Sequence, residues 1–204
     1  MLPKKYFPVL SPLIASYDHN DLAEGTGIVD FLGYTNTKST GEQYGLTTNT
    51  ALFSQSLSGS SAITVGGPFE LDFDSAPLNK PLVIKGTAIF NMTWKVLNSS
   101  GSNSNYPFVY LRKWDGSTET DIGFVSGSIV DLNSVAKTSC LKISGISPTL
   151  IKIGEQIRVT YGVDASTAGN SPVAHISFDP QGSTTGFGGI TSKLIAHLPF
   201  RIAQ

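Results

Sequence analysis

The segment Pro81–Leu97, PLVIKGTAIFNMTWKVL, decides the fold class because its side chains change character at every second position. The even positions are Leu82, Ile84, Gly86, Ala88, Phe90, Met92, Trp94 and Val96, whereas most odd positions are polar. In a β-strand, alternate side chains point to opposite faces, so this period of two predicts a strand with one buried face. A helix would scatter the polar residues around its circumference.

Similar alternation recurs at short intervals on both sides of this segment. The further strands are predicted over residues 69–73, 108–114, 120–130, 139–146, 156–163, 174–178 and 194–202. The dipeptide Asp115-Gly116 favours a tight turn, which predicts a hairpin between residues 108–114 and 120–130. About eight strands with turn signals between them predict an all-β fold, an antiparallel β-sandwich of the jelly-roll type. Short helical turns are predicted only at residues 131–137 and 147–152.

The first third of the sequence has a different texture. Pro3, Pro8 and Pro12 interrupt the apolar N-terminus, which favours an extended arm over a signal peptide. Residues 33–67 are rich in Thr, Ser, Gly and Asn. We therefore predict an N-terminal arm and Gly/Ser/Thr-rich excursion over residues 1–61, and a β-sandwich domain over residues 62–204.

Composition excludes several classes of function. The 14 Lys and Arg residues face 15 Asp and Glu residues, and no basic run exceeds Lys4-Lys5, so nucleic-acid binding is unsupported. The sequence contains no run of about 18 apolar residues, so no membrane-spanning helix is predicted. Cys140 is the single cysteine, so no intramolecular disulfide can form, and stability must come from packing or association.

The stretch 173–189 contains the strongest candidate for an active-site loop. His175 and His197 lie on polar-facing positions of late strands and could approach each other. Two histidines without a certain carboxylate are an incomplete catalytic or metal site. Because Asp179-Pro180 ends a strand in ordinary turn chemistry, we interpret the stretch as a strand end and a loop. Cys140 is interpreted as a packed side chain of a strand, and no nucleophile motif occurs.

Acidic and aromatic residues offer further candidate sites. The acidic groups are Asp18, Asn20, Asp21 and Glu24 in the arm, and Glu70, Asp72 and Asp74 in FELDFD. The first group lacks the spacing of a calcium loop, and the second shares one strand face that is predicted to be solvated, so neither a metal nor a cofactor is predicted. Tyr110 and Trp114 are candidate ligand-binding residues, although they share a face with Phe108 and core packing explains them as well.

Three segments near the end of the chain resemble virus structural proteins. They are LIKIGEQIRVTYGV at 150–163, HISFDP at 175–180 and SKLIAHLPFRI at 192–202. In these segments the chain resembles the jelly-roll proteins of tailed bacterial and archaeal viruses, such as capsid decoration, spike or tail-associated subunits. The resemblance implies a location in the virion and association with other virion proteins.

The function expected from these features is that of a non-enzymatic virus structural protein. It would assemble with itself or dock on a capsid or tail lattice, through apolar arm residues that a partner must cover. These arm residues are Tyr6, Phe7, Val9, Leu10, Leu13 and Ile14. The arm could equally fold back on its own sandwich. The alternative function is a carbohydrate- or receptor-binding module, and a third hypothesis is a β-fold hydrolase or lyase that depends on His175 or His197.

Overall fold

The described part of the protein consists of strands and connecting segments. The computed structural model describes residues 26–38, 41–52, 54, 56–97, 104–131, 135–167, 172–182, 187, 189–191 and 193–201. Within these ranges there is no helix, and hence none long and apolar enough to span a membrane. The strands are β1 (Thr26–Lys38), β2 (Gly41–Thr47), β3 (Ser58–Ala62), β4 (Phe69–Asp74), β5 (Leu82–Leu97), β6 (Ser104–Trp114), β7 (Glu119–Ser126), β8 (Val130–Asp131), β9 (Lys137–Ile151), β10 (Gln156–Thr167), β11 (Val173–Ser177) and β12 (Ile195–Arg201).

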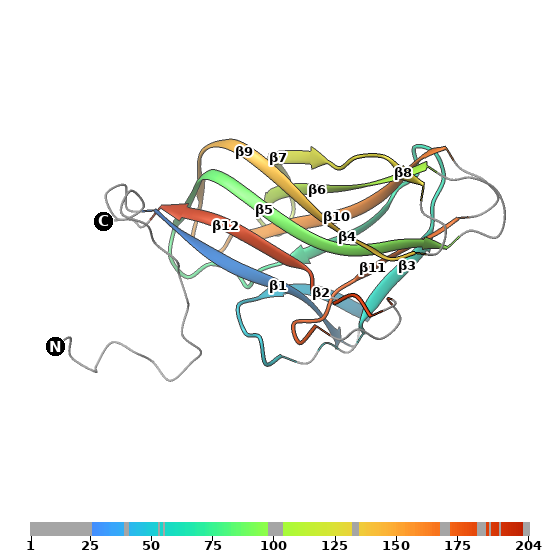
Figure 1. Cartoon of the computed structure of the whole chain (residues 1–204). Helices are drawn as coiled ribbons and strands as arrows, with labels where there is room; N and C mark the ends of the chain where they lie inside the picture. The colour runs from blue at the N-terminus through green and yellow to red at the C-terminus, as the bar shows by residue number, and fades with distance from the viewer. Residues whose placement is uncertain are drawn as a thin grey trace.

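The strands form two layers, which Figure 1 shows one in front of the other. The front layer has the order β9-β5-β12-β1-β2, and β11 and β3 extend it beside the second half of β5. The back layer has the order β4-β10-β6-β7. Named strands pair antiparallel except where β2 meets β4, through one parallel pair, Gly45 and Asp74. The predicted antiparallel all-β class is confirmed, with twelve strands in place of about eight.

The core lies between the layers and is built by the predicted alternation. The side chains of Ile84, Phe90 and Trp94 on β5 are fully buried, as is every second residue of β10 from Ile157 to Val163. Its centre is aromatic. The ring of Phe73 lies 5.3 Å from that of Tyr44, 5.9 Å from that of Tyr161 and 5.5 Å from that of Phe178, each in an edge-to-face arrangement.

The predicted hairpin is confirmed, with β6 and β7 paired from Phe108 to Trp114. At its turn, Asp115 Oδ1 accepts hydrogen bonds from the backbone N–H groups of Ser117 and Thr118. The helical turn predicted at residues 147–152 is wrong, because β9 runs through Ile151 and pairs with Leu82 there. Part of the other predicted turn, residues 131–137, lies outside the described residues.

The described residues between 26 and 62 differ from the predicted excursion, because they contain three paired strands. β1 pairs with β12 from Thr26 to Leu32, and on its other side it pairs with β2. β3 pairs with β11, so the boundary predicted at residue 62 coincides with the last residue of a strand within the sheet. Hydrogen bonds to distant strands hold these polar segments, and such pairing needs no strongly apolar sequence. The predicted arm contacts, residues 6–14, lie outside the described residues.

Candidate functional site

A cleft of about 650 Å³ opens at the seam where β2 of the front layer meets β4 of the back layer. Its walls come from β1, β2, β4, the segment that follows β4 and the first residue of β10. We call it the seam cleft. The side chains that bring hydrogen-bonding groups to its lining are Tyr34, Asn36, Gln43, Tyr44, Thr47, Asp72, Asp74, Ser75 and Gln156. A polar lining with a few aromatic side chains is suited to a small polar ligand.

One wall of the seam cleft depends on a close contact between an aromatic ring and a glycine. Tyr34 and Gly45 are directly paired across β1 and β2. A Cβ atom at Gly45 would lie 2.6 Å from Cε1 of Tyr34 and 2.8 Å from its hydroxyl oxygen. Only glycine therefore lets the Tyr34 ring rest against the backbone of β2.

Hydrogen bonds hold the segment after β4 against β10. The backbone N–H of Ser75 donates to the carbonyl oxygen of Ile157 at 2.9 Å, and the N–H of Ile157 donates to Oγ of Ser75 at 3.0 Å. The side-chain amide of Gln156 donates to the carbonyl oxygen of Ser75. These bonds fix the cleft lining before a ligand arrives, so little ordering would accompany binding.

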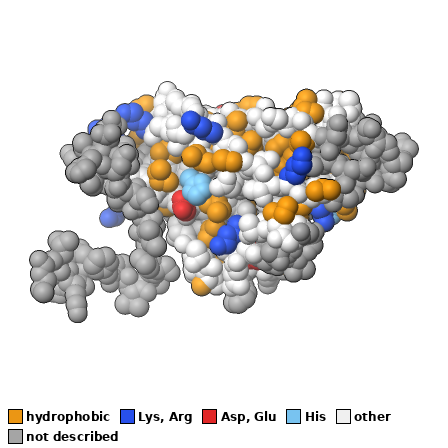
Figure 2. Space-filling view, viewed as in Figure 1, with side chains coloured by type: hydrophobic (Ala, Val, Ile, Leu, Met, Phe, Trp, Pro, Cys, Tyr) orange, Lys and Arg blue, Asp and Glu red, His pale blue; other side chains and the backbone are white. Residues whose placement is uncertain are grey.

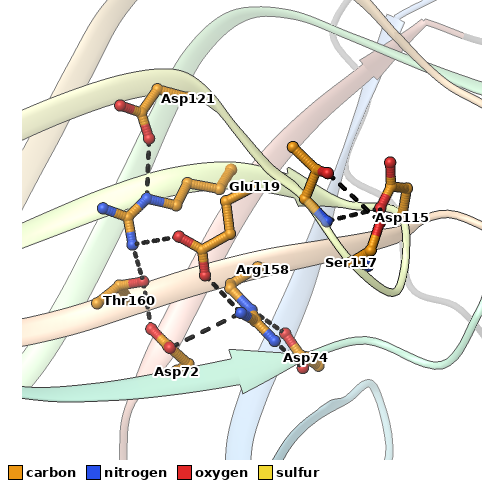
Figure 3. A network of polar contacts seen from close by, with 10 residues as sticks. Asp72, Asp74, Asp115, Ser117, Glu119, Asp121, Arg158 and Thr160 are labelled. Atoms are coloured by element: carbon orange, nitrogen blue, oxygen red, sulfur yellow. Dashed lines mark hydrogen bonds and ion pairs between the residues drawn. The ribbon is translucent and has the colours of Figure 1, made fainter.

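A network of charges lies behind the cleft on the outer face of the back layer (Figure 3). Arg158 donates from Nε and Nη2 to the two oxygens of Asp74, each at 2.7 Å, and it also contacts Glu119. Asp72 Oδ1 accepts a hydrogen bond from Thr160 at 2.6 Å, while its Oδ2 lies 3.8 Å from Arg158 Nη1. These contacts, with the hydrogen bond to Asp74 foremost, raise the pKa of Arg158 further above its ordinary value.

A second guanidinium extends the network toward β7. Arg112 forms ion pairs with Glu119 at 3.3 Å and with Asp121 at 2.8 Å. Together with Arg158, Asp72 and Asp74, the network holds two guanidinium groups and four carboxylates, which leaves two negative charges in excess. The predicted common face of the FELDFD carboxylates is present, but Asp72 and Asp74 both pair with Arg158 on the neighbouring strand β10.

Glu70 lies on the same strand as Asp72 and Asp74 and has a raised pKa. Burial raises the pKa of Glu70, and the carboxylates of Asp72, Glu119 and Asp164 raise it further, against the opposing effect of Arg112. Burial is thus the main reason that the charged form of Glu70 is disfavoured.

The candidate ligand residues Tyr110 and Trp114 lie on this outer face. The residues that alternate with them, Val109 and Leu111, are fully buried between the layers, so interlayer packing is the wrong explanation for the two aromatics. The ring of Tyr110 stacks on Phe124 at 4.5 Å and under Arg112 at 4.1 Å. Trp114 stacks with Arg158 at 4.2 Å. Ligand binding by Tyr110 and Trp114 stays a prediction.

A polar cluster of His197, Asp30 and Asn91 lies on the outer face of the front layer. Figure 2 shows a histidine on this face beside an acidic side chain, with hydrophobic side chains around them. His197 Nδ1 lies 2.6 Å from Asp30 Oδ1, across the pairing of β12 with β1. Since the carboxylate can only accept, Nδ1 carries a proton, and the neutral ring then accepts at Nε2 from the side-chain amide of Asn91 at 3.1 Å. His197 thus has the carboxylate partner that the sequence left uncertain.

His175 does not join this cluster. It pairs with Lys95 on β5, whereas His197 pairs with Ile89 on the same strand. Six residues of strand separate these positions, or about 20 Å. The predicted approach of the two histidines is therefore wrong, because β11 and β12 occupy successive parts of one edge of β5.

His175 is expected to make the fold sensitive to mild acid. Burial lowers its pKa from the ordinary value of 6.5, and Lys95 lowers it further, so the folded protein binds a proton less readily than the unfolded chain. The free energy of unfolding should fall as the pH drops below 6.5, until the folded state also binds the proton. Urea denaturation between neutral and acidic pH should show a smaller fall for His175→Gln than for the unmodified protein. Parallel pH profiles would contradict this.

The remaining sequence candidates do not form sites in the described part of the chain. The packed position predicted for Cys140 is wrong, because its side chain is exposed on β9. It lines a shallow groove of about 390 Å³ between β7 and β9. The Asp18 group and residues 183–186 and 188 lie outside the described residues. No group of three or more His, Cys, Asp or Glu side chains among the described residues could hold a metal ion. The seam cleft was missed, and the only sequence signal for it was the FELDFD alternation.

Comparison with known proteins identifies similarities of fold. No protein-family model matches the sequence, and no curated protein is similar to it. The structure of an α-amino acid ester hydrolase matches with a TM-score of 0.56 at 12% identity, over 84% of this chain and 36% of that chain. A CocE/NonD family hydrolase from Staphylococcus aureus matches with a TM-score of 0.49 at 12% identity, over 85% of this chain and 36% of the hydrolase. This chain therefore spans well under half of the hydrolases it resembles.

A distant likeness to a virus structure is also present. The structure of infectious bursal disease virus, Gx strain, matches with a TM-score of 0.30 at 10% identity, over 88% of this chain and 38% of that chain. This agrees in direction with the predicted resemblance to virus proteins and with a virion location, but so low a score supports no argument. Nothing found supports the finer prediction of a tailed virus.

The function expected from the sequence is contradicted by these comparisons. The expected function was a non-enzymatic virus structural protein, with a carbohydrate- or receptor-binding module as the alternative. The structural neighbour with a TM-score of 0.56 is a hydrolase. At 12% identity, this likeness concerns the fold, and it removes the ground for excluding an enzymatic role.

Proposed function

We propose that this chain is a β-sandwich domain of a hydrolytic enzyme and holds a small polar substrate or product in the seam cleft. The observation that carries the proposal is a similarity of fold to an α-amino acid ester hydrolase. The matched region covers 84% of this chain and 36% of the hydrolase. Fold likeness alone is an analogy, so the proposal also depends on the cleft. The cleft lies between the layers' edges, where its lining is held by hydrogen bonds within the protein.

The cleft chemistry supports a polar ligand. Asn36 and Gln43 are exposed side-chain amides with both donor and acceptor groups. The ring of Tyr34 adds a flat apolar surface beside them. A ligand with one short apolar part and several hydrogen-bonding groups would match this lining.

The test is a titration of the protein with small probes, in which binding is detected from the nuclear magnetic resonance shifts of backbone amides. The probes are L-alaninamide, L-lactamide and N-acetyl-L-alanine methyl ester. At least one should give saturable shifts confined to the residues of the seam cleft. The double variant Asn36→Ala, Gln43→Ala should weaken that binding about tenfold, as expected for the loss of one or two hydrogen bonds. Gln181→Ala, which removes an exposed amide elsewhere, should leave the binding unchanged. Absence of saturable binding of all three probes would overturn the proposal.

A second candidate function places hydrolysis on this chain itself. Asp30 orients His197, and once the Asn91 amide turns away from Nε2, the lone pair of Nε2 can take a proton from a water molecule that attacks a carbonyl carbon. The side-chain N–H of Asn91 lies beside that position and can donate to the developing oxyanion.

This second function predicts turnover of p-nitrophenyl acetate by the purified chain. His197→Gln should lower the rate at least about a hundredfold, since a general base commonly contributes that much. His175→Gln serves as the control because that histidine lies on β11, away from the cluster. Equal rates for the unmodified protein and His197→Gln would exclude this function and leave the binding role.

Self-association and contacts with other virion proteins stay predictions, as does a location in the virion.

A further inference from the structure

We infer that the seam cleft selects ligands that carry a primary ammonium group. This inference rests on the proposed use of the cleft as a ligand site, but it does not depend on any hydrolytic step.

The first ground is the charge of the lining. Asp72 and Asp74 line the cleft, and no lysine or arginine side chain does so among the described residues. Arg158 lies behind Asp74 and uses both oxygens of that carboxylate. A cationic ligand therefore meets carboxylates first, and no positive side chain of the lining competes with it.

The second ground is the unused capacity of Asp72. Its Oδ1 accepts a short hydrogen bond from Thr160, but its Oδ2 lies 3.8 Å from the nearest guanidinium nitrogen, too far for a hydrogen bond. The side chain is 43% exposed, so this oxygen can be reached from solvent. A carboxylate oxygen with a free lone pair is the preferred acceptor of a charge-assisted bond from an ammonium group.

The third ground is the surrounding electrostatic field. The arginine network, with Asp72 and Asp74 counted among its four carboxylates, carries two negative charges in excess (Figure 3). They favour a cation in the cleft and disfavour an anion.

The fourth ground is the aromatic wall. Tyr34 lines the cleft and rests on Gly45. The face of a tyrosine ring attracts a cation, and the ring also covers the methylene groups that an alkyl ammonium carries. Gln156, whose amide nitrogen is used by Ser75, keeps its carbonyl oxygen as a further acceptor.

The test compares two probes of nearly equal shape, L-alaninamide and L-lactamide, at neutral pH and low salt. The first presents an ammonium group where the second presents a hydroxyl. Calorimetry should show L-alaninamide binding at least about tenfold more tightly, as expected when one charge-assisted hydrogen bond replaces a neutral one.

Two isosteric variants separate the cleft from the general field. Asp72→Asn should remove most of the preference for L-alaninamide. Asp121→Asn makes the same chemical change in the same network, outside the cleft lining, and should keep the preference. If the amide spectra of both variants remain those of the folded protein, the altered probe affinity reflects a change in binding and not a loss of folding.

The outcomes distinguish this inference from the proposed function. Equal affinity for the two probes, or an undiminished preference in Asp72→Asn, would overturn the ammonium selectivity while leaving the cleft as a ligand site. Binding of neither probe, nor of the methyl ester, would overturn both.

Discussion

Phe73→Ala is expected to lower the free energy of unfolding by about 3–5 kcal/mol, the range typical of a phenylalanine removed from a closely packed core. The Phe73 side chain is fully buried, and its ring packs against Tyr44, Tyr161 and Phe178. These rings come from three strands in both layers and from Phe178, which directly follows β11, so the cavity left by alanine cannot close by a local movement. Urea denaturation followed by fluorescence would measure the loss.

Two further variants make this prediction specific. Phe124→Ala makes the same change at a ring that is 50% exposed, and it should cost about 1 kcal/mol or less. Phe73→Leu keeps most of the volume and should fold even if the alanine variant does not, with a loss of about 1–2 kcal/mol. A similar loss for Phe73→Ala and Phe124→Ala would contradict the position of Phe73 at the centre of the core.

Arg158→Gln is expected to lower the free energy of unfolding by about 2 kcal/mol. Removing one partner of a buried ion pair costs about 3–5 kcal/mol, but the carboxylates of this network are partly exposed, which reduces the cost. The side chain of Arg158 is 13% exposed and contacts Asp72, Asp74 and Glu119. Glutamine leaves these carboxylates without their shared cation, so their mutual repulsion becomes the main effect.

The matched control for Arg158→Gln is Lys113→Gln. Lys113 contacts a single carboxylate, Glu155, at 3.7 Å, and such a pair contributes about 0–1 kcal/mol. High salt should reduce the difference between Arg158→Gln and the unmodified protein, because salt screens the repulsion among the carboxylates. A loss for Arg158→Gln no larger than that for Lys113→Gln would show that the network contributes little to stability.

Strands with strong alternation could be predicted from the sequence, and polar strands could not. β5 and β10 were predicted because every second residue is apolar over a long run. β1 was missed because its partners, β12 and β2, make it a strand, and the Thr26–Leu32 pairing joins residues about 170 positions apart in the chain. Alternation is a local signal, so it cannot show a strand that is stabilised mainly by its neighbours.

The candidate sites were harder to predict for the same reason. The period of two placed Tyr110 and Trp114 on one face with Phe108, but it could not say which face lies between the layers. The structure places Phe108 on the outer face, where a Cβ atom at Gly162 would lie 2.1 Å from its ring. Likewise, His197 could not be matched with Asp30, because only the pairing of β12 with β1 brings them together.

The seam cleft combines both difficulties. Its lining comes from residues 34–47, 72–77 and 156, which no local pattern connects. The alternation in FELDFD correctly predicted that Asp72 and Asp74 share a face. It could not predict that Arg158 would bind one of them fully and leave an oxygen of the other available.

The place of β12 in the front layer bears on how the protein is made. β12 lies between β1 and β5, although Ile195–Arg201 follows every other described strand in the chain and is synthesised after them. Until that strand emerges, β1 and the first half of β5 each present an unpaired edge, and exposed edges readily pair with other chains. The front layer therefore closes only after translation has passed residue 201, and a polypeptide that stalls earlier should aggregate or be degraded rather than accumulate as a partial fold.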